Sequence, residues 1–371
     1  MRRLIYPLAS FCIACSDGGS LYRDALPVAE NLSSMESVWS HDSLVLNGGQ
    51  GQFDFVVAEG SQSFLVVVSG LSGAEYLISS LRGPDGVLVR AEANEAEAAS
   101  GFGAAAGPFF SPNRSVGDHG GATLLVPNDP LLRLTPGRWE LGVTSSSVEQ
   151  HELRVDRLEL HAAGLPLRSV IPLTIHLSGA EGMTGALGRG HERLDRALQK
   201  VEQVYEPAGL AFEPITFVDL APEFRVLDAV DLRSQKALQM LGRGVGRAGI
   251  NLFIIERFEN DEALLGDVGG VSAAIPGDPR GGEPLSGVVV ATSFSEDAAA
   301  RDLLGLTMAH EIGHFLGLFH SEEANGFEDN LSDTLASEGS NLMHHLSRPG
   351  FDVLSAEQGM VLRLNPAMQL P

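Results

Sequence analysis

Three histidines and one glutamate near residue 310 have the spacing of a metal site. Residues 310–320 read HEIGHFLGLFH, so His310 and His314 are four residues apart and Glu311 directly follows the first of them. On a helix, residues four apart share a face, so both imidazoles can reach one metal ion, and zinc favours such ligands. Glu311 is then placed to take a proton from a water molecule on that metal.

His320 can become a third ligand only if the chain leaves the helix. In a continuous helix His320 would lie ~9 Å further along the axis than His314 and ~120° around it, whereas zinc–nitrogen bonds are about 2 Å long. Gly317 stands where the chain must turn back, and glycine accepts left-handed backbone angles at little cost. The sequence therefore predicts zinc held by three neutral histidines, with a fourth position open to water.

The same string resembles the signature of the metzincin zinc peptidases, in which this extended motif is followed by a methionine-containing turn. Residues 340–345 read SNLMHH and are the candidate turn, in which Met343 would support the three histidines from below without binding zinc. The alternative is a core methionine, since methionine commonly fills irregular gaps. We favour the turn, because Met360 and Met368 lie in or beyond a later helical pattern.

Two positions near the turn bear on this resemblance. One departs from the metzincin pattern, and the other resembles one particular metzincin subfamily. Several metzincin families carry a tyrosine two residues after the turn methionine, but His345 stands there and all four tyrosines lie upstream of residue 310. His345 either donates a hydrogen bond in place of the tyrosine or faces solvent, and we favour the second. The pair Asp333-Thr334 resembles a loop of the pappalysin-like metzincins, although Leu335 replaces the usual proline.

Acidic residues in this segment raise the question of a calcium site. Oxygen ligands, which calcium prefers, are offered by Glu328, Asp329, Asn330 and Asp333. Their spacing fits no EF-hand loop. A solvated acidic loop is the interpretation we favour.

Hydrophobic periodicity in the second half predicts alternating strands and helices. Strands are expected at 169–177, 212–220, 250–255, 269–275 and 287–291, and helices at 191–205, 232–241, 301–316 and 355–364. The edge strand at 269–275 would pair with an extended substrate through main-chain hydrogen bonds. The resemblance implies an α+β catalytic domain over residues 169–371, with a mixed twisted sheet, a zinc helix and a C-terminal helical subdomain.

The front half predicts export and a separate all-β module. Residues 1–15 have a basic start, an apolar stretch and an Ala14-Cys15 end that resembles a lipoprotein signal with Cys15 as the lipid anchor; ordinary secretion is the alternative. Both place the protein outside the cytoplasm, in the cell envelope or secreted. Residues 16–45 are expected to be a tether, and residues 46–162 a β-sandwich-like accessory domain, joined by a linker at 161–168.

Charge and cysteine content limit the classes of function. The chain has 25 basic and 48 acidic residues, a net charge of −23, which argues against nucleic acid as a partner. Its two cysteines, Cys12 and Cys15, both lie in the expected signal, so no disulfide is predicted in the exported body.

The resulting hypothesis is an exported zinc endopeptidase that acts on a protein or peptide, with Glu311 as general base. One alternative replaces His320 by Glu338 as the third ligand, as in thermolysin-like enzymes. The other is a surface-anchored binding lipoprotein with an inactive protease-like domain. The sequence does not specify an oligomeric state.

Overall fold

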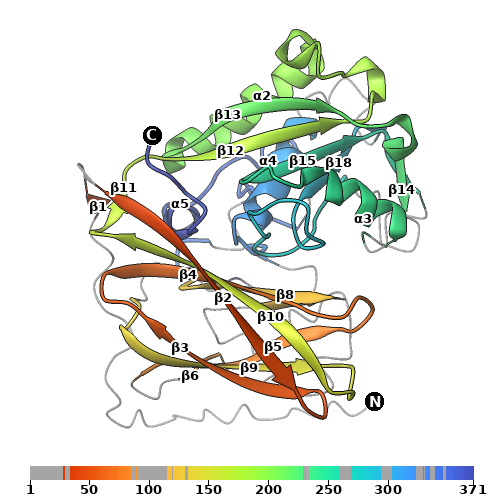
Figure 1. Cartoon of the computed structure of the whole chain (residues 1–371). Helices are drawn as coiled ribbons and strands as arrows, with labels where there is room; N and C mark the ends of the chain where they lie inside the picture. Colours follow the sequence, from red (N-terminus) through yellow and green to blue (C-terminus); the bar gives the residue numbers. More distant parts are fainter. Residues whose placement is uncertain are drawn as a thin grey trace, which may run out of the picture.

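The computed structural model describes residues 28–29, 34–84, 88–90, 115–118, 120–129, 133–228, 232, 234–259, 269–293, 303–322, 329, 331–334, 339–345 and 348–371. Figure 1 shows a β-sandwich built by the front half, drawn below a mixed sheet with helices built by the second half. The expected signal at 1–15, with Cys15, lies outside the described residues. Within the described ranges, no helix combines the length and apolar character that a membrane span requires.

Two antiparallel sheets form the front half. The larger has the strand order β2 (Met35–Leu46), β10 (His151–Ala162), β4 (Ser61–Ser69), β8 (Gly121–Val126) and β7 (Ser115–Asp118). The smaller has the order β3 (Gln50–Val57), β9 (Gly137–Ser145), β5 (Tyr76–Arg82) and β6 (Leu88–Arg90). Between them Phe64 packs edge to face against both Phe55 and Trp139, with ring centroids 5.4 and 5.5 Å apart. The two sheets agree with the all-β character predicted for residues 46–162.

The predicted tether at 16–45 is wrong over its last part. β2 pairs with β10 along all of its length, so the sandwich begins near residue 35 rather than 46. Only Leu44 and Leu46 of β2 are buried. A strand at the edge of a sheet that is held by main-chain pairing needs no hydrophobic alternation, which is why periodicity did not reveal it.

A five-stranded sheet is the centre of the second half. Its order is β13 (Leu210–Asp219), β12 (Ser169–Leu177), β15 (Ile250–Ile255), β18 (Val288–Ala291) and β17 (Gly270–Ser272). The first four strands are parallel and β17 is antiparallel at the edge. The strands predicted at 169–177 and 250–255 are confirmed with the same bounds, whereas the one predicted at 269–275 is only three residues long.

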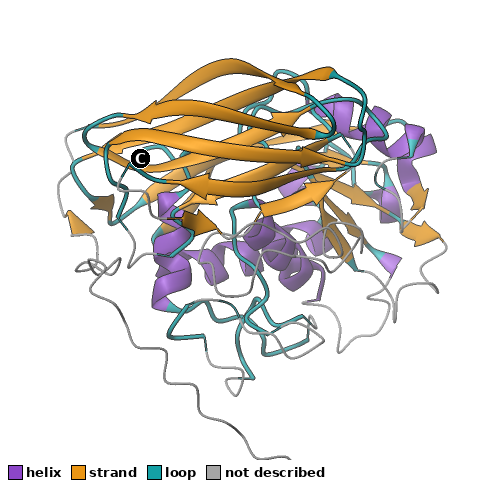
Figure 2. Cartoon of the chain, turned by 90° about the horizontal axis from the view of Figure 1, so that it is seen from below, coloured by secondary structure: helices purple, strands orange, loops and turns teal. Residues whose placement is uncertain are grey.

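Helices cover both faces of this sheet, as parallel strands require. On one face, α2 (Glu192–Tyr205) and α4 (Leu303–Phe315) share a buried apolar cluster with β12, β15 and β18. On the other, α3 (Gln235–Leu241) packs near the small parallel pair β14 (Val226–Asp228) and β16 (Arg257–Glu259). In Figure 2 the helices, in purple, lie below the long strands drawn across the top and beside their right-hand end.

The expected linker at 161–168 is docked rather than free. β10 continues to Ala162, and β11 (Leu165–Pro166) pairs in parallel with β1 (Val28–Ala29). Leu165 is buried against Leu364 at the end of α5 (Ala356–Leu364), which opens with a capping box of Ser355 and Gln358. The two halves are therefore joined by packed structure.

The larger sandwich sheet also packs directly on the second half. Leu65, Val67 and Leu158 form an apolar cluster with Ala274 and Leu285. Polar contacts lie beside this cluster. The fully buried carboxylate of Asp156 forms ion pairs with Arg154, at 2.7 Å, and with Arg280. The Arg280 guanidinium in turn lies 4.8 Å from the Trp39 ring centroid. β4 is consequently covered on both faces, and every residue of its neighbour β8 is also buried.

Candidate metal centre

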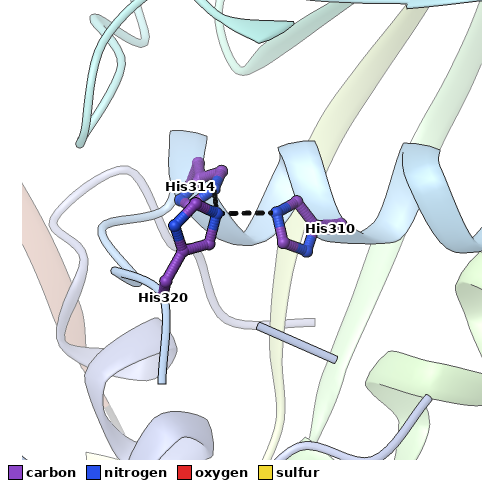
Figure 3. A group of neighbouring side chains, drawn as sticks. All are labelled: His310, His314 and His320. Carbon is purple, nitrogen blue, oxygen red and sulfur yellow. Dashed lines mark hydrogen bonds between the residues drawn. The ribbon is translucent and has the colours of Figure 1, made fainter. Parts of the chain in front are cut away.

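Helix α4 supplies two imidazoles and one carboxylate from a buried position. His310, Glu311 and His314 are 4%, 7% and 6% exposed, because the helix lies between the sheet and the chain that follows it. His320, beyond the helix, turns its ring back toward them (Figure 3). Its Nε2 atom lies 3.2 Å from Nε2 of His310 and 3.1 Å from Nε2 of His314. The structure thus brings together the three histidines that the sequence predicted.

Backbone carbonyls fix the tautomers of the two helical histidines. Nδ1 of His310 donates to the Leu342 carbonyl and Nδ1 of His314 to the Leu318 carbonyl, both at 2.8 Å. A proton on each Nδ1 leaves a lone pair on each Nε2. Burial and the neighbouring His310 and His320 hold the pKa of His314 well below its usual value, which favours the neutral ring. These nitrogens are therefore ready to bind a metal ion.

The chain turns back at Gly317, as predicted. Gly317 has a φ of 109°, in the region that favours glycine. Its N–H donates to the His314 carbonyl, and the N–H of Leu318 donates to the Gly313 carbonyl, both at 2.9 Å. This pair of bonds is a Schellman motif, which ends helices and reverses the chain.

Met343 packs against α4, the helix that carries His310 and His314 (the metal-site helix). It is fully buried, and a Cβ added to Gly313 would stand 2.6 Å from its sulfur, so the methionine fills the space beside that glycine. The Met343 N–H donates to the Asn341 side chain at 2.8 Å, and the Asn341 amide pairs with Gln358 of α5. The segment that carries Met343 is thereby anchored to the last helix.

Glu311 lies beneath the edge strand β17. Burial raises its pKa to about 8, an effect opposed by a hydrogen bond from the Ser272 backbone. A cation beside the carboxylate would lower that pKa again. A Cβ on Gly270 would come within 2.6 Å of the Glu311 side chain. The strand can therefore pass so close to Glu311 only because residue 270 is a glycine. Sequence reasoning missed Ser272 and Gly270, although a glycine inside a predicted strand signals close approach.

His345 does not match the favoured expectation of a solvent-facing ring. It is half-buried, its Nδ1 donates to the Glu322 carbonyl at 3.0 Å, and it stacks on His344 with ring centroids 4.4 Å apart. Its ring centroid lies 6.5 Å from that of His320. The stacking partner is the adjacent residue, whereas the carbonyl belongs to Glu322, 23 residues away, which sequence spacing does not indicate.

Two carboxylates of the acidic segment, those of Asp329 and Asp333, accept hydrogen bonds from other groups of the protein. Asp329 accepts from the Leu331 N–H and the Thr334 hydroxyl, and Asp333 accepts from the Glu357 N–H. Glu328, Asn330 and the rival ligand Glu338 fall outside the described residues. Within the described part, the three histidines form the one group of three or more metal-binding side chains with ligand atoms within 4.8 Å of one another. Calcium therefore stays an untested prediction.

Comparisons with known proteins add no family. No family model and no curated protein matches this sequence. Among solved structures, the chain is similar to a mutant xylanase 10C from Cellvibrio japonicus in complex with xylopentaose, at 11% identity and a TM-score of 0.18. The match covers 58% of this chain and 40% of that one. So low a TM-score carries no argument about fold or activity.

Proposed function

We propose that this protein is a zinc-dependent endopeptidase of the metzincin type, and that its exported form acts on protein or peptide chains. The observation that carries the proposal is the convergence of three imidazole nitrogens, with Nε2 separations of 3.1 and 3.2 Å. Around a tetrahedral zinc ion with bonds of 2.0–2.1 Å, neighbouring nitrogens are about 3.3 Å apart. The geometry of the donors therefore fits such an ion.

The choice of zinc rests on the chemistry of the donor set. Neutral imidazoles suit zinc and other late transition metals, whereas calcium and magnesium require oxygen ligands. Three protein ligands with one open position are typical of catalytic rather than structural zinc. The partly exposed His320 ring leaves an approach from solvent.

Glu311 would perform the proton transfers. A bound zinc ion would act as a Lewis acid on the scissile carbonyl and would lower the pKa of an attacking water. The Glu311 carboxylate would accept the proton of that water and then deliver it to the leaving amine. The Ser272 N–H, which donates to the Glu311 carboxylate, would orient it for both transfers.

The edge strand β17 would hold the substrate in an extended conformation. Among the strands that the structure describes it pairs with β18 alone, and Gly270–Ser272 runs directly past Glu311. Main-chain pairing at such an edge accepts many side chains, which suits a peptidase. Met343 would support the histidines from below, and Cys15 would anchor the exported chain to a membrane.

Metal content and proteolysis test the proposal together. The full chain is expected to bind one equivalent of zinc and to cleave an unstructured protein such as casein, with activity lost to a chelator and restored by zinc. The variant Glu311→Gln should keep its zinc and lose about 100- to 10,000-fold in turnover. Undiminished proteolysis by that variant would reject the role of Glu311. Bound zinc without cleavage would favour the alternative, a surface-anchored binding protein whose protease fold is inactive.

A further inference from the structure

Four consecutive carbonyls, from the last residue of helix α4 to the third residue beyond it, each accept a hydrogen bond from a different part of the chain. The Phe315 carbonyl accepts from the Gly277 N–H at 2.8 Å, and the Leu316 carbonyl accepts from the Asn365 side chain at 3.0 Å. The Leu318 carbonyl accepts from the imidazole of His314. The last carbonyls of a helix have no partner within it, so donors of this kind decide where the following segment lies.

The remaining carbonyl, that of Gly317, accepts from the β-sandwich. Nδ2 of Asn128 donates to it at 2.8 Å, and Asn128 is 6% exposed. Asn128 follows the end of β8 by two residues, so this bond joins the front half of the chain to the turn between the second and third histidines. A buried carbonyl that loses such a donor is left without a hydrogen bond, which destabilises the backbone conformation to which it belongs.

An apolar contact from the same strand accompanies this bond. A Cβ added to Gly317 would stand 2.8 Å from a methyl carbon of Leu125, so the leucine lies directly against the turn. Leu125 is fully buried and belongs to the apolar cluster that contains Phe315, Leu316 and Leu318. A residue of the sandwich is therefore part of the core on which the metal site is built.

We infer that Asn128 is a positioning residue of the metal centre, and that with Leu125 it makes the β-sandwich a necessary part of that centre rather than a separable accessory. His320 is three residues beyond Gly317, and its Nε2 must lie within about 0.5 Å of its place to complete a metal site. Asn128 holds the carbonyl of the turn from which His320 extends. The inference rests on the metal site of the proposed function but not on proteolysis.

The test measures metal affinity in the full-length protein. Zinc dissociation constants would be determined by competition with a chelator for the wild-type chain, Asn128→Ala and Asn128→Asp, and the absorption spectrum of the cobalt-substituted proteins would report the ligand geometry. The Asp variant keeps the shape of the side chain and carries the test if the Ala variant does not fold. Both variants are expected to bind zinc at least about tenfold more weakly, with an altered cobalt spectrum.

A matched control separates positioning from general loss of stability. Asn251 is buried and lies on β15, outside the metal site. Like that of Asn128, its side-chain amide donates to a backbone carbonyl, that of Arg247, at 2.9 Å. Asn251→Ala should lower the thermal stability of the metal-free chain and leave zinc affinity and the cobalt spectrum unchanged.

Two outcomes would overturn the inference in distinguishable ways. If the wild-type chain bound no zinc, the metal site itself and the inference would both be wrong. If the wild type bound zinc normally and both Asn128 variants stayed within twofold of it, or if Asn251→Ala weakened binding as much as they do, only the role of Asn128 would be wrong.

Discussion

The metal-site helix and the segment that follows it are specified in different ways. In α4 the residues from Leu304 to the end of the helix are buried, and His310 and His314 share a face because they are one helical turn apart. The return segment, residues 316–322, contains no helix or strand and is held by hydrogen bonds from residues far away in the sequence. Two ligands are thus encoded locally, and the third depends on the tertiary structure.

Removal of single ligands should give the largest effect. His314→Ala and His320→Ala are each expected to weaken zinc binding at least 100-fold, because each ligand contributes roughly 3 kcal/mol to a site worth about 10–16 kcal/mol. Only His314→Ala should also destabilise the metal-free chain, since it empties a buried position and frees the Leu318 carbonyl. Chelator competition and urea unfolding provide the two measurements.

Glu338→Ala serves as the control for the third ligand. If zinc were retained by His320→Ala and lost by Glu338→Ala, the thermolysin-like arrangement would replace the three-histidine site.

Truncation of Met343 should lower both stability and metal affinity. Met343→Ala removes a fully buried side chain, at a cost of about 2–5 kcal/mol, and opens space beneath Gly313 between the two helical histidines. Met368 is also buried, but the atoms nearest to a Cβ on Gly313 belong to Met343 and Tyr205. Met368→Ala should therefore match the stability loss, measured by urea unfolding, without a change in zinc affinity; equal affinity in both variants would make Met343 an ordinary core residue.

A buried histidine on the opposite sheet face from α4 should make the chain sensitive to acid. His176 stacks on Phe253 and donates to Asn251, and burial lowers its pKa from 6.5 to about 4. The unfolded chain binds this proton more readily, so stability is full above pH 6.5 and falls as the pH drops towards 4, by up to about 3 kcal/mol. Urea unfolding of the metal-free chain across that range should show a shallower fall in His176→Gln; an unchanged slope would assign the acid sensitivity to other groups.

The smallest effect on stability is expected from the loss of a hydrogen bond between α4 and a residue distant in the sequence. Tyr205 donates to the Ala309 carbonyl at 2.7 Å from inside the core. Tyr205→Phe should cost about 1 kcal/mol in urea unfolding and leave zinc affinity unchanged, because the helix keeps its own geometry. A loss of affinity as large as that of Asn128→Ala would mean that α4 depends on distant contacts as much as the return segment does.

Strand burial shows how far the sequence pattern could be interpreted. β3 alternates between exposed and buried residues towards its end, whereas every residue of β8 is buried. An antiparallel strand with no alternation is covered on both faces, and the second half of the chain provides the outer cover. The apolar runs at 63–68 and 123–126 predict strands, but no local pattern indicates what lies against their second face.

The sequence by itself determined the main helices and buried strands of the second half and the local half of the site: the helix that aligns His310 with His314, the place of Glu311, and the glycine at which the chain reverses. These follow from helical periodicity and backbone sterics, which act over a few residues. Only the tertiary structure decided how the reversed chain is held, through an asparagine 189 residues away, and that the sandwich begins at β2 and packs against the metal site. Such contacts join residues whose separation leaves no period in the sequence.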